Sequence, residues 1–433
     1  MPDLSKDGWA CAYRRLAEDL RAMAADAPIT LCGMSACVDA RTELHQLEAL
    51  FATTDPDAAA FAGLLRDRAR QGIGGEVRVD WPGGPAWLAK NVAFTYALGG
   101  TGPQTAWVLS TLGAPALLAL EDRSAHMLAN LPAGLLVFQG TNVVPAALVA
   151  PHGERRPDIY IFDYTQGIPV GGVVPPRSSR IIVRFNDAGL EHDASFDRST
   201  PDLARTAGAG LISGFNCVPS AELSTEIERV FALGANWRRS GLDVLHLELA
   251  GYDSIASLER VLQGAAHVVT SLGMSHSEFA ALMSEGASLA NDMVELGERL
   301  GVMRVCVHAD EWAASVTLGD PVTERQALMA GSLLAAARAE VGRPVRPHDV
   351  PKAATFTDPP YRNGPVEGPW SFVCCATPYL SRPATTLGLG DTFTAGCLLV
   401  LGLDRRRGQE LDGSLPYQAA ASPIETNKPR RNS

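Results

Sequence analysis

The sequence predicts an α/β protein with a doubly wound, mostly parallel sheet and a smaller, β-rich lid domain. Apolar runs of strand length alternate with helical stretches along most of the chain, which is typical of parallel sheets covered by helices. The 433 residues are 46% hydrophobic, enough to bury a large core in more than one domain. Shorter strand-like pieces around 72–80 and 159–185 interrupt the alternation and predict a second, small sheet.

The chain begins with an amphipathic stretch at 6–25, whose apolar residues recur at helical spacing and predict a helix. The apolar run 29–32 follows and predicts the first strand, which leads through 33–38 to Asp39. Ligands of parallel α/β sheets bind at the carboxyl ends of the strands. Asp39 is therefore a candidate acceptor of hydrogen bonds from substrate hydroxyls, and a helix cap is an equal alternative.

Residues 43–70 predict helical structure, and a glycine turn at 72–75 leads into a short alternating strand that begins at Glu76. A second glycine-rich loop contains Gly99 and Gly100, reaches Gln104 and opens a helix at 105–112. Such a loop lets a polar ligand approach the backbone closely. A tight turn that binds nothing is an equally common reading of the same pattern.

The rest of the chain continues the alternation. Strands are predicted at 116–120, 135–138, 159–162, 181–185, 210–212, 244–249, 267–270, 304–307 and 372–376. Helices are predicted at 221–238, 255–263, 277–299 and 323–341. From Leu403 onward the chain has no apolar period, so 403–433 is predicted to be a loose tail.

Composition narrows the classes of partner. Forty-eight acidic residues against 37 basic ones give a net charge of −11, which argues against nucleic acid or an anionic membrane and favours a small-molecule substrate. Eight scattered cysteines lack paired C-x-x-C spacing, so we expect reduced, buried thiols in a cytoplasmic protein. No leader-like segment and no apolar run of roughly 18 residues is present, so neither export nor membrane anchoring is expected.

The stretch 385–396 has the pattern of an anion-binding loop. Gly388 and Gly390 bracket Leu389 ahead of an apolar helical run, so backbone N–H groups and the positive helix end would face a phosphoryl group. Asp391 would then accept the proton of an attacking hydroxyl, while the N–H groups stabilise charge on the phosphoryl oxygens. The alternative is an ordinary turn whose aspartate caps a helix, because short glycine motifs recur by chance.

Five separated stretches together resemble a known family. They are residues 33–39, 99–104, 159–167 (IYIFDYTQG), 246–250 (HLELA) and 388–391. The most specific part is HLELA followed at matching distance by residues 269–278, similar to a His-x-Glu and Asn-x-x-Glu pair. In this order the stretches resemble the ADP-dependent sugar kinases, the glucokinase and phosphofructokinase branch of the ribokinase-like superfamily.

The resemblance implies a metal and a nucleotide contact. Mg²⁺ would be held, largely through waters, by Glu248 and Glu278, which suits an ion that sheds water reluctantly. Ser275 stands where the family has asparagine, which alters one polar contact. Arg180 matches the family's arginine that contacts the nucleotide phosphate, with Arg184 as a nearby alternative. His308 lies in a matching strand and is assigned no catalytic role.

The resemblance also bears on the acceptor. Cys37 and Thr101 replace amides common in the family's sugar-contacting loops, so the sugar contacts differ here. Glu76 matches a glutamate that favours unphosphorylated glucose, because its charge would repel a phosphate. Arg78 would share a strand face with Glu76 and could neutralise it or bind a phosphate itself.

Together these matches imply a large ribokinase-like domain (1–39, 97–144 and 189–402) and a small lid (40–96 and 145–188) with the site between them. The expected activity is Mg²⁺-dependent transfer of the terminal phosphoryl group of ADP to a hydroxyl of an unphosphorylated, glucose-like acceptor, releasing AMP. Two alternatives are an ATP-dependent ribokinase-like kinase acting on a sugar or nucleoside and a non-catalytic ligand-binding relative. The presence of Asp391, Glu248 and Glu278 argues against the non-catalytic alternative.

Overall fold

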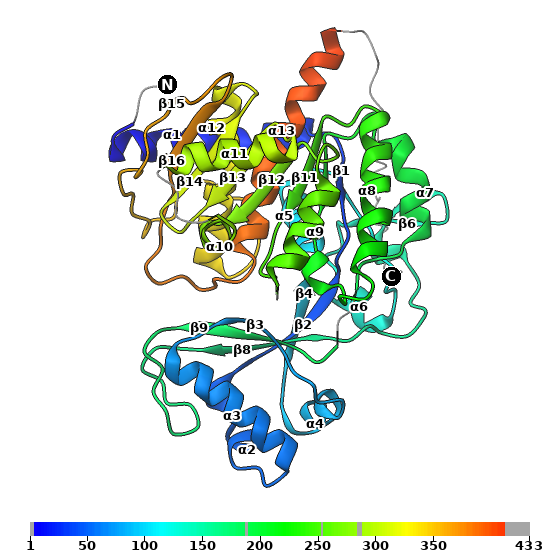
Figure 1. The fold of residues 1–433 in the computed structure, drawn as a ribbon, viewed down its shortest axis with the longest axis vertical. Helices are drawn as coiled ribbons and strands as arrows, with labels where there is room; N and C mark the ends of the chain where they lie inside the picture. The colour runs from blue at the N-terminus through cyan, green and yellow to red at the C-terminus, as the bar shows by residue number, and fades with distance from the viewer. Residues whose placement is uncertain (1–3, 187–188, 253, 284–287, 412–433) are drawn as a thin grey trace, which may run out of the picture.

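The computed structural model describes residues 4–186, 189–252, 254–283 and 288–411 and contains two β-sheets. The large sheet has eleven strands in the order β15-β16-β14-β13-β12-β11-β10-β1-β5-β6-β7. The small sheet has five strands in the order β3-β9-β8-β2-β4. Figure 1 shows the small sheet and its helices as a separate body attached to the large one through β2 and β4.

The centre of the large sheet is parallel. Its parallel strands are β1 (Thr30–Cys32), β5 (Ala116–Leu118), β6 (Leu136–Gln139), β10 (Ala209–Ile212), β11 (Val244–Glu248), β12 (Ser271–Ser275) and β13 (Arg304–His308). Antiparallel strands form both edges: β7 (Asn142–Pro145) on one side, and β14 (Trp312–Thr317), β16 (Ser371–Ala376) and β15 (Gly364–Pro365) on the other. The prediction of a mostly parallel sheet is confirmed, although the sheet is mixed at its edges.

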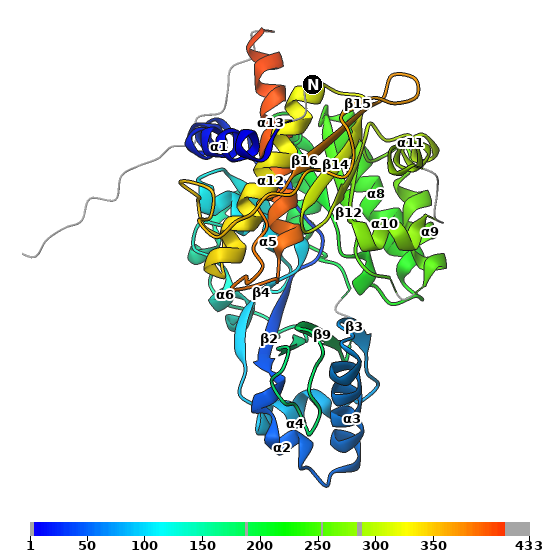
Figure 2. The same cartoon turned by 90° about the vertical axis from the view of Figure 1, so that its left-hand side faces the viewer.

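Helices cover both faces of the large sheet, which confirms the doubly wound prediction. One layer contains α1 (Lys6–Asp26), α5 (Thr101–Leu112), α12 (Pro321–Val341) and α13 (Leu389–Leu411), which contact one another. The other layer contains α7 (Ala194–Leu203), α8 (Leu223–Arg239), α9 (Ile255–Ala265), α10 (His276–Leu282) and α11 (Leu289–Leu300) (Figures 1 and 2). The short α6 (Ala125–Asn130) contacts β2 and β4. This burial explains why the strands read as continuous apolar runs.

The small sheet has its own core. Its strands are β2 (Cys37–Glu43), β3 (Gly75–Arg78), β4 (Thr95–Gly99), β8 (Ile159–Tyr164) and β9 (Ser179–Arg184), and its helices are α2 (Glu48–Phe51), α3 (Pro56–Gln71) and α4 (Gly84–Asn91). Aromatic rings of Phe61, Trp81, Phe162 and Phe185 pack between them. Strands β3, β8 and β9 fall within the predicted lid stretches, whereas β2 and β4 each extend three residues beyond them, and the domain boundaries themselves stay a prediction.

Two predicted elements are displaced. The strand predicted at 267–270 is wrong: β12 begins at Ser271, because His267 adopts a left-handed φ of 60° and belongs to the preceding turn. The predicted helix 277–299 is represented by α10 and α11, with 284–287 outside the described residues.

The predicted loose tail is also partly wrong. Helix α13 runs to Leu411, well past Leu403, and arginine at 405–407 is a good helix former. Residues 412–433 lie outside the described part of the chain.

The cysteines differ in exposure. No disulfide forms within the described residues, which include all eight cysteines. Five thiols are buried as expected, whereas Cys11 is exposed and Cys37 and Cys217 are half-buried. Among the helices that the structure describes, none has both the length and the apolar character needed to cross a bilayer.

Candidate active site

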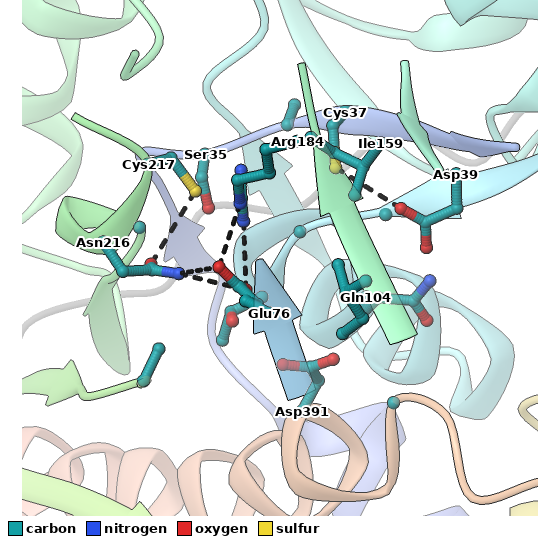
Figure 3. A pocket seen from close by; sticks show the side chains of 18 of the residues that line it. Ser35, Cys37, Asp39, Glu76, Gln104, Ile159, Arg184, Asn216, Cys217 and Asp391 are labelled. Atoms are coloured by element: carbon teal, nitrogen blue, oxygen red, sulfur yellow. Dashed lines mark hydrogen bonds and ion pairs between the residues drawn. The ribbon is translucent and has the colours of Figure 1, made fainter. Parts of the chain in front are cut away.

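A pocket with a volume of about 180 Å³ lies where the two sheets meet (Figure 3). It is lined by side chains from the small sheet, from the loop before α5 and from the segment that begins α13. The predicted site residues on its wall are Asp39, Glu76, Gly99, Gly100, Gln104, Gly388 and Asp391. Leu389 and Gly390 are not on the wall and form the first residues of α13.

The turn before α13 has the geometry of an anion-binding loop. Gly388 has a φ of 68°, in the left-handed region that favours glycine, and a Cβ there would run into the Arg338 guanidinium. The Thr392 hydroxyl donates to the Gly388 carbonyl oxygen at 2.7 Å and secures the turn. The N-terminal end of a long helix thus faces the pocket, where its dipole and N–H groups favour an anion.

Asp391 lies in the first turn of α13 and on the pocket wall. Burial raises the pKa of its carboxyl group, while the Arg338 charge and a hydrogen bond from Thr101 oppose that rise. A buried carboxylate with a raised pKa is suited to take a proton from a hydroxyl. The position agrees with the predicted general base, and that role stays a prediction.

Asp39 faces the pocket from β2 and is only 6% exposed. Because it lies within a strand, the alternative reading as a helix cap is wrong. Burial raises its pKa to about 7 despite the nearby Arg41. The Cys37 thiol donates to Asp39 Oδ1 at 3.7 Å, and Gly99 leaves the space that this carboxylate occupies. Asp39 is thus a buried hydrogen-bond acceptor on the lining of the pocket, and its contact with a substrate hydroxyl stays a prediction.

Glu76 is paired in the structure with Arg184. Arg184 donates from Nε to Oε2 at 2.9 Å and from Nη2 to Oε1 at 3.1 Å, a bidentate arrangement. Asn216 Nδ2 also donates to both Glu76 oxygens, at 3.3 and 3.4 Å. Arg78, which could have paired with Glu76, instead donates to the Asn216 carbonyl oxygen at 2.8 Å. Arg184, on the neighbouring strand β9, therefore compensates the Glu76 charge inside the pocket.

Arg180 also lies on β9 and extends toward the α13 turn. Its Nη2 donates to the Thr386 hydroxyl, two residues before Gly388. Burial lowers the pKa of Arg180, whereas Asp163, Asp39 and Asp391 raise it. The small sheet thus places a cation beside the Gly388 turn. Its contact with a nucleotide stays a prediction.

The two predicted metal-holding glutamates lie on neighbouring elements. Glu248 is 7% exposed, and it binds His246 Nε2 through Oε2 at 2.8 Å and His308 Nε2 through Oε1 at 3.4 Å. Burial opposes its ionisation, but the hydrogen bonds from His246 and His308 outweigh burial and lower its pKa to about 2. Glu278 accepts from the Ser275 N–H at 2.7 Å and forms a capping box at the start of α10. Ser275 therefore orients Glu278.

These carboxylates fit a metal held through water. Glu248 stays anionic, and a carboxylate offers about four lone-pair sites, more than the histidines use. Within the described ranges, no group of three or more His, Cys, Asp and Glu side chains is arranged to hold a metal directly. Mg²⁺ keeps several waters and is commonly bound through few carboxylates and substrate phosphates, so the donor set suits it.

Sequence reasoning missed Arg338, which is 4% exposed and lies on α12. It also missed Asn216, which reaches the pocket from the large body. A single arginine in an alanine-rich helix carries no motif. The only available signal is that Arg338 lies in the stretch AAARAE, on a helix whose buried residues surround it.

The fold is that of the ribokinase-like class, with a large sheet, a small sheet and a pocket where the two meet. Comparison with known proteins supports this class. The model of the ADP-specific phosphofructokinase/glucokinase conserved region matches residues 69–400. The chain therefore belongs to the family of ADP-specific phosphofructokinases and glucokinases.

Individual relatives are distant. The ADP-dependent glucose/glucosamine kinase of Pyrococcus furiosus is 22% identical over 282 residues, which cover 55% of this chain and 60% of that protein. A solved ADP-dependent kinase in complex with fructose-6-phosphate and ADPβS has a TM-score of 0.75, 17% identity, and coverage of 93% of this chain and 99% of the other. The last common ancestor of ADP-dependent phosphofructokinases from Methanosarcinales has a TM-score of 0.72, 17% identity and coverage of 92% and 99%.

Proposed function

We propose that this protein transfers the terminal phosphoryl group of ADP to a hydroxyl of an unphosphorylated sugar and releases AMP. The carrying observation is that Asp391, the Gly388 turn and Asp39 all line the same pocket. Asp39 would accept hydrogen bonds from the acceptor hydroxyls. Asp391 would take the proton of the attacking hydroxyl, while the turn and helix end would bind the phosphoryl oxygens.

Mg²⁺ would neutralise charge on the nucleotide phosphates. Glu248 and Glu278 would hold its water shell, Glu248 as a carboxylate whose pKa the neighbouring histidines lower and Glu278 in an orientation set by its capping box. Arg180 would contact the phosphates from the small sheet, since it already binds Thr386 beside the turn.

The acceptor is proposed to be uncharged because the pocket wall carries three carboxylates, on Asp39, Glu76 and Asp391, and one arginine, Arg184. The guanidinium is occupied by the bidentate pair with Glu76, so it is not free to bind a phosphate. The relative from Pyrococcus furiosus is named as a glucose/glucosamine kinase, which favours a hexose. A cytoplasmic location would supply both sugar and nucleotide.

An assay of the product nucleotide tests this proposal and separates it from the alternatives. Purified protein is incubated with Mg²⁺, ADP or ATP, and a panel of sugars, sugar phosphates and nucleosides, and the nucleotides are separated by chromatography. We expect AMP to accumulate from ADP with a neutral sugar. Accumulation of ADP from ATP alone would establish the ATP-dependent alternative. Absence of turnover with every pair, while ligands still bind, would establish a non-catalytic relative.

A further inference from the structure

Arg338 is a buried cation that lies against the Gly388 turn. It projects from α12 and is 4% exposed. Its Nη1 donates to Gln104 Oε1 at 2.8 Å and to Thr392 Oγ1 at 3.0 Å. Moving a guanidinium out of water costs free energy unless hydrogen bonds or an opposite charge compensate for the lost hydration. The two hydrogen bonds of Arg338 supply such compensation and fix the position of its side chain.

The two acceptors belong to different parts of the pocket. Gln104 lies on α5 and on the pocket wall, and its amide nitrogen donates to the Leu98 carbonyl oxygen on β4. Thr392 follows Asp391 on α13 and also donates to the Gly388 carbonyl oxygen. One guanidinium nitrogen therefore joins the acceptor side of the pocket to the turn that would bind the phosphoryl group.

The contact with the turn is close. The Arg338 guanidinium fills the space that a Cβ on Gly388 would need. Its planar group also lies 5.9 Å from the Trp107 ring centroid, which restricts its orientation from the α5 side. Movement of the guanidinium would therefore release the turn, Gln104 and the first turn of α13 together.

We propose that Arg338 is a positioning residue for phosphoryl transfer, holding Gln104 and the Gly388 turn in one fixed relation so that Asp391 and the acceptor hydroxyl meet. The inference rests on the proposed function for its catalytic consequence. It differs from a purely structural role because the same side chain sets both acceptor affinity and the geometry of the reacting groups.

The charge of Arg338 adds a second effect. Burial raises the pKa of Asp391, and Arg338 is the largest influence that lowers it. Asp39 on β2, Arg180 on β9, Glu248 on β11 and His308 on β13 also act on Asp391 from neighbouring elements. Since Asp391 must be ionised to accept a proton, loss of the Arg338 charge should move the acidic limb of kcat to higher pH.

Three variants separate these effects. Arg338→Met removes the charge and both hydrogen bonds, and we expect a higher acceptor KM, a kcat loss of up to about 10²-fold and an acidic limb at higher pH. Arg338→Lys keeps the charge but not the planar guanidinium group. The acidic limb of the kcat pH profile should therefore stay at its wild-type pH, while the acceptor KM should still rise. Thr392→Val keeps the arginine but removes the hydroxyl that joins Arg338 to the Gly388 carbonyl oxygen, so two hydrogen bonds are lost, and it should reproduce part of the kcat loss even if Arg338→Met does not fold.

Hydrogen exchange provides a readout that does not need activity. Backbone amides in 385–396 should exchange faster in Arg338→Met and Thr392→Val than in wild type. Arg229→Met is the control, because Arg229 also ties elements together through Asp197 and Glu226, on α7 and α8. This control variant should leave amide exchange in 385–396, the acceptor KM and the pH profile of kcat unchanged.

Wild-type exchange in 385–396 together with wild-type acceptor affinity in both test variants would overturn the positioning role. If the wild-type protein transfers no phosphoryl group at all, the proposed function fails instead. The exchange rates would then decide on their own whether Arg338 holds the turn.

Discussion

Asp39 combines burial with an ionisable group that faces a ligand pocket. Its pKa is raised to about 7 by burial, so the folded state binds a proton more tightly than the unfolded chain. The unfolded chain has already released that proton between about pH 4 and 7, so stability falls as pH rises through this window. A charge that destabilises the empty protein is retained where a ligand can use it.

Replacing Asp39 tests this trade-off. Asp39→Asn should remove this loss of stability with rising pH. The variant should therefore be more stable than wild type at pH 8, by about 2–4 kcal/mol, and should bind the acceptor more weakly. Urea unfolding of the empty protein from pH 5 to 8 measures the effect. Asp67→Asn is the control, because Asp67 is an exposed aspartate paired with Arg70. If the free energy of unfolding depended on pH identically in wild type and Asp39→Asn, the Asp39 carboxylate would be ionised without a cost in stability.

Glu278 offers a clean test of the metal proposal. Glu278→Gln removes the charge but retains an oxygen for the Ser275 capping box, so α10 should stay intact. The Mg²⁺ concentration for half-maximal rate should rise about tenfold or more, because a charged acceptor for metal-bound water is lost. The control Glu298→Gln, on the next helix α11, should leave the Mg²⁺ concentration for half-maximal rate unchanged. An unaltered Mg²⁺ requirement in Glu278→Gln would make this carboxylate purely structural.

At the scale of elements, the parallel pairing of β3 with β9 decides which cation meets Glu76. Their register places Glu76 opposite Ile182 and Arg78 opposite Arg184. Arg184 can therefore extend back along the sheet to Glu76, while Arg78 reaches Asn216 on the large body. The Glu76–Arg184 ion pair at the pocket therefore depends on a strand pair and not on one residue.

Removing Glu76 should change acceptor choice. Glu76→Ala leaves Arg184 unpaired beside the pocket, where a guanidinium would attract a phosphate. The ratio of kcat/KM for a neutral sugar to that for its phosphorylated form should fall about tenfold or more. Asp80→Ala, in an exposed position shortly after β3, is the control. A preference for the phosphorylated sugar in wild type, or an unchanged ratio in Glu76→Ala, would contradict this view of specificity.

Much of the order of strands and helices can be predicted from the sequence pattern. The strands that were not predicted correctly have physical explanations. Continuous apolar runs such as β5 and β10 are predicted because buried parallel strands need them. Strand β12, with the sequence SLGMS, has weak β propensity and forms because β11 and β13 supply partners on both sides. Strand β14 was likewise hidden, since WAASVT has small residues that only tertiary pairing makes a strand.

The site was predictable where chemistry follows a local motif. Asp391 and Gly388 belong to one turn, and both line the same pocket as Asp39. Arg338 was not predictable, because it meets Gln104 across 234 residues of sequence. The Glu76–Arg184 pair spans 108 residues and depends on strand register, which composition does not encode.

At the scale of the whole molecule, the two bodies touch on both sides of the pocket. Glu76 and Arg78 contact Asn216 on one side, and Arg180 contacts Thr386 on the other. This arrangement suits a kinase, because closure of two bodies over a site excludes the water that would hydrolyse the nucleotide.

The most direct test of the central claim follows phosphorus during the reaction. ³¹P NMR of Mg²⁺, ADP and the accepted sugar should show one AMP and one sugar phosphate formed for each ADP consumed. Asp391→Asn should lower that rate by at least about 10²-fold while ADP still binds, as expected for loss of a general base. Formation of inorganic phosphate in place of sugar phosphate, or near wild-type transfer by Asp391→Asn, would contradict the account.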